Sequence, residues 1–172
     1  MDHEKTQQDM IIIGQYASVW VERLEFGYNF NPYNHMTVAF FSFLEVKQGN
    51  YKISGSAQCH VLVGNTGSVY FETNGSRRAD GTFLVNEEIV PDKFGKTPDF
   101  LAGFFYAASN SSINSQAIGF KGQATGRKFV VEGNSALDIG GTSPCEIPGN
   151  QPGIRRTGGQ LLTHPGSFVE IP

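Results

Sequence analysis

The feature that most constrains the fold is a two-residue alternation of apolar and polar side chains between Tyr51 and Val63. The apolar face carries Tyr51, Ile53, Ala57, Cys59, Val61 and Val63. The polar face carries Lys52, Ser54, Ser56, Gln58 and His60. This period is typical of a β-strand with one face against a core. Gly55 interrupts the segment, and a glycine inside a strand indicates a bulge or a sharp bend.

Similar apolar segments recur along most of the chain. We expect further strands over 12–26, 36–46, 69–73, 82–90, 115–125 and 127–132. Turn signals such as Asn65-Thr66-Gly67 and Asp80-Gly81 separate them, because these residue types accept the backbone angles of tight turns. No repeat of fixed period is visible. Consecutive strands joined by short turns indicate an antiparallel meander.

Two segments bear on how the strands are covered. Residues 38–44 are apolar on both faces, which is typical of a strand that is covered on both sides. Residues 97–108 fit two structures. Thr97 and Pro98 suit the start of a helix, whereas the following phenylalanines also fit a doubly buried strand, and both alternatives stay open.

These features predict an all-β fold. We expect an antiparallel meander that forms a small closed or nearly closed β-barrel, with a β-sandwich as the alternative and a short helix near residues 98–109. The barrel domain would span 11–139, after a leader over 1–10. Residues 140–172 hold five of the eight prolines, so we expect an extended tail that docks on the barrel or on a neighbouring subunit.

Composition excludes several classes of protein. The chain of 172 residues is too short for two ordinary domains. An aromatic content of 12% argues against disorder. With 13 basic and 16 acidic residues there is no basic excess for a nucleic acid. The acidic start and the short apolar run Met10–Ile13 do not resemble a secretory signal or a membrane span, so we expect a soluble, cytoplasmic protein.

The cysteines and histidines do not form a recognisable metal or redox motif. Cys59 and Cys145 are far apart, so we expect two free thiols, with a disulfide that pins the tail as the alternative. The four histidines lack ligand spacing, and we expect no metal and no cofactor. His60 would line the lumen if the polar face of its strand points inward, and would be solvated if that face points outward.

Candidate catalytic groups are Glu87, Glu22 and His60. Glu87 shares a strand face with apolar residues, and Glu22 lies between Trp20 and Leu24 on its own face. Burial raises the pKa of a carboxyl group, which would suit it for general acid or base chemistry. The alternative is that these carboxylates sit at strand ends and reach water.

Aromatic residues and one carboxylate supply the candidate ligand-binding groups. We expect these to be Tyr16, Trp20, Phe41, Tyr70, Glu72, Tyr28 and Tyr33. Tyr28 and Tyr33 belong to a loop rich in Tyr and Asn, which suits either a recognition lip or a loop packed on the end of the barrel.

Three functions follow as hypotheses. The first is a barrel that binds a hydrophobic or aromatic small molecule, with cyclase, isomerase or lyase activity that needs no cofactor. The second is a non-catalytic carbohydrate- or peptide-binding β-module. The third is a structural subunit that forms a homo-oligomer through residues 140–172. We expect neither a nucleic acid nor a membrane as a partner.

Overall fold

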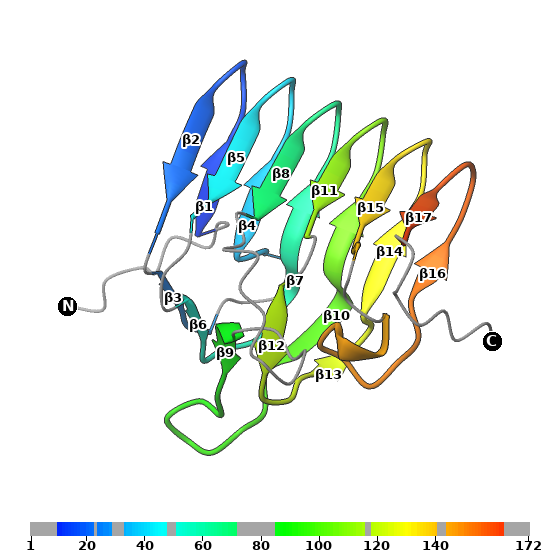
Figure 1. Ribbon diagram of the computed structural model, residues 1–172. Coiled ribbons are helices and arrows are strands. Elements are labelled where there is room, and N and C mark those ends of the chain that lie inside the picture. The colour runs from blue at the N-terminus through cyan, green and yellow to red at the C-terminus, as the bar shows by residue number, and fades with distance from the viewer. Residues whose placement is uncertain are drawn as a thin grey trace, which may run out of the picture.

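The strands wind in successive coils around one axis (Figure 1). The computed structural model describes residues 10–22, 24–28, 33–47, 51–71, 85–115, 118–140 and 144–163. Each strand pairs with the equivalent strand of the next coil, and every strand pair in the described part is parallel. A chain that stacks parallel coils in this way is a β-solenoid.

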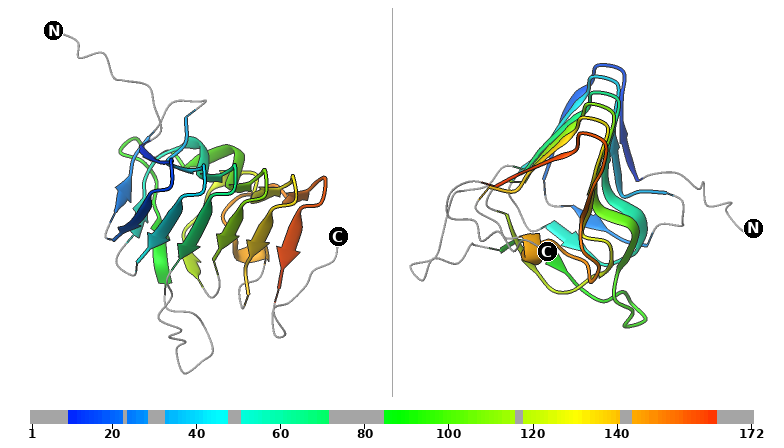
Figure 2. Two further views of the ribbon diagram at one scale, coloured as in Figure 1. Left: turned by 90° about the horizontal axis from the view of Figure 1, so that it is seen from above. Right: turned by 90° about the vertical axis from the view of Figure 1, so that its right-hand side faces the viewer.

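Three sheets form the sides of the solenoid, as the view along the axis shows (Figure 2). Sheet A contains β1 (Ile11–Ile13), β4 (Met36–Val38), β7 (Ala57–Val63), β10 (Asp99–Ala107), β14 (Phe129–Val131) and β16 (Ile154–Arg155), and β13 (Thr125–Gly126) pairs with β10. Sheet B contains β2 (Ser18–Val21), β5 (Phe43–Val46), β8 (Ser68–Phe71), β11 (Ser112–Asn114), β15 (Ala136–Asp138) and β17 (Gln160–Leu162). Sheet C contains β3 (Glu25–Phe26), β6 (Tyr51–Ile53), β9 (Val85–Ile89) and β12 (Gly119–Lys121).

Helical structure is confined, in the described part, to the 3₁₀ turn η1 (Pro144–Glu146). No helix in that part has the length and apolar character needed to cross a membrane. Residues 144–163 form η1 and the last coil, with β16 and β17 in sheets A and B.

The coils repeat at a nearly constant step. Pairing aligns Ile11 with Met36 and Met36 with Val61, a step of 25 residues each time. Phe105 aligns with Phe129, a step of 24 residues. The step from Val61 to Phe105 is 44 residues, because the chain between β8 and β10 is longer than the corresponding part of the other coils: residues 72–84, which lie outside the described part, precede β9, and residues 90–98 follow it. The prediction that the chain has no fixed period is therefore wrong, and this long coil is what hid the repeat.

Each coil turns from sheet A into sheet B through two residues with positive φ. These pairs are Gln15–Tyr16, Phe40–Phe41, Asn65–Thr66, Ser109–Asn110, Gly133–Asn134 and Thr157–Gly158. Two-residue turns of this kind also close β-hairpins. Here they join strands that belong to different sheets, so the chain advances along the axis instead of folding back on itself.

The position after each corner requires a small side chain. It is occupied by Ala17, Ser42, Gly67, Ser111, Ser135 and Gly159. A Cβ added to Gly67 would lie 2.7 Å from the carbonyl oxygen of Val38 in the preceding coil. Ser111 uses the same approach to donate a hydrogen bond from Oγ to the Val63 carbonyl at 2.9 Å. The corner thus brings this position onto the backbone of the coil before it.

Side chains from all three sheets fill the interior of the solenoid. The largest fully buried ones are Phe100, Phe104, Phe105, Met36, Leu44, Ile53, Ile113, Ile118, Leu137, Ile139, Ile147 and His35. All of them except His35 belong to one continuous apolar core that extends from the first coil to the last. The described interior is a packed core, not a lumen.

The expected antiparallel β-barrel, and the β-sandwich alternative, are wrong. The all-β class is confirmed, but strands that follow one another in the chain lie in different sheets. Residues 38–44 are not a doubly covered strand, because β4 ends at Val38 and Phe40 and Phe41 form an exposed corner. The helix near residues 98–109 is also wrong, because that segment is the long strand β10.

Candidate functional site

The outer face of sheet B carries two columns of side chains that run along the solenoid axis. Strand pairing aligns the first column as Trp20, Glu45, Tyr70, Asn114, Asp138 and Leu162. The second column is Ser18, Phe43, Ser68, Ser112, Ala136 and Gln160. Neighbours within a column are one strand spacing apart, ~4.8 Å. Sheet B therefore presents a regular ladder of groups to solvent.

Aromatic side chains gather at the first three coils of this face and at the adjoining corner. We call Tyr16, Trp20, Phe40, Phe41, Phe43 and Tyr70 the aromatic face, and all six are exposed. Trp20, for example, is 61% exposed. A group of large exposed apolar side chains is unusual on a monomer and marks an interaction surface.

Neither burial nor backbone preference explains the aromatic residues Tyr16, Phe40 and Phe41 at the corners. The rings of Tyr16 and Phe41 stack with their centroids 5.4 Å apart and their planes within 5°. Phe40 and Phe41 have φ values of 55° and 59°, a region that bulky residues rarely occupy. Both are exposed. Strain of this kind, retained at an exposed position, points to a role in function.

Polar groups beside the aromatic rings are held in place by local contacts. Lys47 Nζ lies 3.8 Å from Glu45 Oε2 and 5.6 Å from the centroid of the Trp20 ring. Further along the face, Ser112 Oγ donates a hydrogen bond to Ser68 Oγ at 2.9 Å. Hydrogen-bonding groups and ring surfaces therefore alternate over a short distance.

The two carboxylates of the first column are too far apart to act as a pair. Glu45 and Asp138 are separated by three coils, so their backbones lie about 14 Å apart. Carboxylates that cleave glycosidic bonds together lie roughly 5–9.5 Å apart. The Asp138 carboxylate is also oriented locally, because Oδ1 accepts a hydrogen bond from the Gly140 amide at 3.0 Å. Glu45 and Asp138 therefore do not form a pair of the kind that cleaves glycosidic bonds.

The structure brings four of the predicted ligand-binding residues together. Tyr16, Trp20, Phe41 and Tyr70 all belong to the aromatic face. Their coils are consecutive, which is why residues 25 positions apart become neighbours. The surrounding Phe40, Phe43, Glu45, Asn114 and Asp138 were missed. The signal that would have found them is the inward-facing apolar column Val19, Leu44, Val69, Ile113, Leu137 and Leu161, whose members recur at the coil step.

Other predicted residues lie elsewhere. Glu22 follows β2 and is exposed, so it is not a carboxyl group buried among apolar neighbours. Tyr28 is exposed just after β3, and Tyr33 is partly buried before β4. Glu72 lies outside the described residues. Glu87 belongs to β9, and its side chain is outside the described part.

His60 is packed inside the core. Its Nδ1 lies 2.9 Å from Nδ1 of His35, and its ring stacks on Phe104 with the centroids 4.8 Å apart. Burial, together with the neighbouring His35, holds the pKa of His60 well below its ordinary value. His60 therefore lies neither in a barrel lumen nor on a solvated face.

Cys59 is buried, Cys145 is exposed, and the two do not form a disulfide. Within the described ranges, no group of three or more His, Cys, Asp and Glu side chains is arranged to hold a metal ion.

The fold and its surface define a β-solenoid with one exposed aromatic and polar face. No protein-family model matches the chain. Neither a curated protein nor a solved structure matches it. The chemistry of the face is thus the basis for a functional proposal.

Proposed function

We propose that the protein is a non-catalytic carbohydrate-binding β-module that holds an extended neutral glycan along the outer face of sheet B. The observation that carries the proposal is the column Trp20, Glu45, Tyr70, Asn114 and Asp138, in which two exposed aromatic rings and three partly buried hydrogen-bonding side chains share one line.

The chemistry of this column matches that of a sugar chain. Aromatic rings such as Trp20 and Tyr70 offer rigid apolar area for the C–H faces of a pyranose. Carboxylate and amide groups such as Glu45 and Asn114 hydrogen-bond hydroxyl groups. The coil spacing of ~4.8 Å is close to the length of one sugar unit, so successive units would meet equivalent positions.

Charge favours a neutral glycan over an acidic one. Glu45 and Asp138 place two carboxylates on the column, and Lys47 offsets one of them. The chain as a whole has a formal net charge of −3. Like charges would repel a chain of uronic acids.

The small-molecule hypothesis loses its structural premise. It required a lumen, whereas Phe100, Phe104 and Phe105 fill the described interior at 0% exposure. The homo-oligomer through residues 140–172 and the cytoplasmic location stay predictions, and the proposed binding depends on neither.

The test is binding to a panel of soluble neutral polysaccharides, measured by affinity electrophoresis and by calorimetry. We expect Trp20→Ala and Tyr70→Ala each to weaken binding about tenfold, which corresponds to about 1.4 kcal/mol. Phe94→Ala is the matched control, since Phe94 is 82% exposed and lies outside sheet B. The proposal fails if no neutral polysaccharide binds, or if the control weakens binding as much as the two variants do.

A further inference from the structure

The apolar core is incompletely covered at the first coil. Ile11, Ala17, Val21 and Leu24 pack against the core but are only partly buried. Val19, which occupies the inward position of β2, is 38% exposed. The equivalent residues of the second coil, such as Leu44 and Val46, are buried. This end of the solenoid therefore presents apolar side chains that the described part of the chain does not cover.

The opposite end of the solenoid differs in one inward column. One inward column runs through Ile13, Val38, Val63, Ala107 and Val131 and reaches Arg155 in the last coil. Arg155 is exposed. A charged side chain at an inward position ends the apolar column, as polar terminal repeats do in other solenoids.

Open strand edges accompany the apolar side chains of the first coil. β1, β2 and β3 are the terminal strands of sheets A, B and C, so each has one edge without a strand partner in the described part. Such edges are templates for pairing with another chain. All three lie at the same end of the solenoid (Figure 1).

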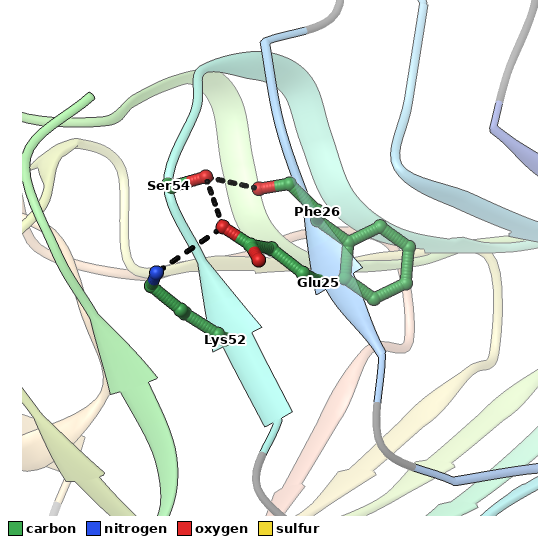
Figure 3. A network of polar contacts seen from close by, with 4 residues as sticks. All are labelled: Glu25, Phe26, Lys52 and Ser54. Carbon is green, nitrogen blue, oxygen red and sulfur yellow. Dashed lines mark hydrogen bonds and ion pairs between the residues drawn. The ribbon is translucent and has the colours of Figure 1, made fainter. Parts of the chain in front are cut away.

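The charge on β3 is directed to the second coil (Figure 3). Glu25 Oε1 lies 3.2 Å from Lys52 Nζ and 3.2 Å from Ser54 Oγ. The Ser54 hydroxyl is also 3.3 Å from the Phe26 carbonyl oxygen. Lys52 and Ser54 thus compensate the charge of the Glu25 carboxylate. This lowers the cost of desolvating Glu25 when an apolar partner covers the first coil.

We propose that a second copy of this chain docks on the first coil, so that two solenoids meet head to head about a two-fold axis. Such an interface is isologous, because each copy supplies the same surface. Head-to-tail stacking is disfavoured because it would place Arg155 of one copy against the inward column that begins at Ile13 of the next. A charge buried there would have no partner to compensate its desolvation.

The mass of the full chain in solution is the first test, measured by light scattering and sedimentation over a wide concentration range. We expect a dimer. Val19→Lys should convert it to a monomer, whereas Leu162→Lys at the other end should leave the dimer intact, since Leu162 is a comparably exposed residue of sheet B. Far-UV circular dichroism and thermal unfolding establish that both variants fold.

Cross-linking supplies a second test that does not depend on a destabilising change. In a Cys145→Ser background, the cysteine of Ser18→Cys on β2 should be linked by a short bifunctional maleimide to the same cysteine of the second copy. Gln160→Cys on β17 should not form a linked dimer.

Three results would overturn the proposal. One is a full chain that is monomeric at every concentration. Another is a dimer that Leu162→Lys disrupts and Val19→Lys does not. The last is a monomer that dimerises only after deletion of residues 2–9, which would identify the chain's own leader as the occupant of this end.

Discussion

The Nδ1 atoms of His35 and His60 lie 2.9 Å apart in the core, where neither side chain is exposed. One imidazole must donate an N–H and the other must accept it, so the contact requires at least one neutral ring. Phe26, Phe100 and Phe104 surround the pair. These neighbours carry no charge that would stabilise an imidazolium.

This pair predicts a loss of stability in mild acid. Burial lowers the pKa of His35 from 6.5 to about 4, and lowers the pKa of His60 as well. The unfolded chain therefore takes up protons first, and the free energy of unfolding falls as the pH drops from about 6.5 towards 4. For His35 alone the loss amounts to about 3 kcal/mol. Urea unfolding at a series of pH values measures it.

The control for this prediction removes both imidazoles. We expect His35→Leu combined with His60→Phe to abolish most of the decline between pH 6.5 and 5, whatever its stability at neutral pH. Carboxylates titrate mainly below this window. An equally steep decline in the double variant would show that other groups cause it.

Gly67→Ala should destabilise the corner of the third coil. The added Cβ would lie 2.7 Å from the Val38 carbonyl oxygen, and overpacking of this kind costs about 1–3 kcal/mol. Gly27→Ala is the matched control, because nothing lies within 4 Å of the Cβ that it would add. Thermal unfolding of the two variants compares them. Equal stability of both would mean that the coils move apart easily.

Phe40→Asn should stabilise the protein by about 1 kcal/mol, because asparagine tolerates the left-handed backbone conformation better than phenylalanine does. Asn65→Phe makes the opposite change at the equivalent corner, where φ is 46°, and should be destabilising. Urea unfolding of both variants decides the sign. A loss of stability in Phe40→Asn would show that contacts of the Phe40 ring outweigh the backbone strain.

Glu45→Gln tests whether the face only binds. Because Glu45 and Asp138 are three coils apart, we expect no release of reducing ends when the protein is incubated with a bound glycan. The variant should change affinity only modestly, since an amide replaces one hydrogen-bond acceptor and keeps the shape. Reducing ends that the unmodified protein releases, and the variant does not, would contradict the binding-only proposal.

The sequence alone reveals the strands but not their partners. The alternation in residues 51–63 correctly predicts β-structure, but not one strand: the segment forms β6 and β7 in two different sheets, and His60 of its polar face is buried. It is silent on whether the neighbouring strand is four residues away or 25. The turn at Asn65-Thr66-Gly67 was located correctly, yet its residues suit a hairpin and a solenoid corner equally well. The 44-residue third coil then interrupts the period that would have decided the matter.

The sequence also predicts only part of the candidate surface, because it does not show which residues the coil step aligns. Tyr16, Trp20, Phe41 and Tyr70 stand out as aromatic residues in any environment. Glu45 and Asp138 become relevant only when the coil step places them in line with Trp20 and Tyr70. The sequence predicts a strand interior at Phe40 and Phe41, because apolar residues at a left-handed corner are contrary to the usual turn chemistry.

The third coil accommodates 19 or 20 more residues than its neighbours, since its step is 44 residues against 25 and 24, while its strands keep their pairing on both sides. The number of coils and the length of any one coil can therefore change independently in this architecture. Duplication of residues 129–152, a single step of the repeat, would lengthen sheet B by one strand without disturbing the corners. Insertion of whole coils can therefore adjust the length of the outer face of sheet B.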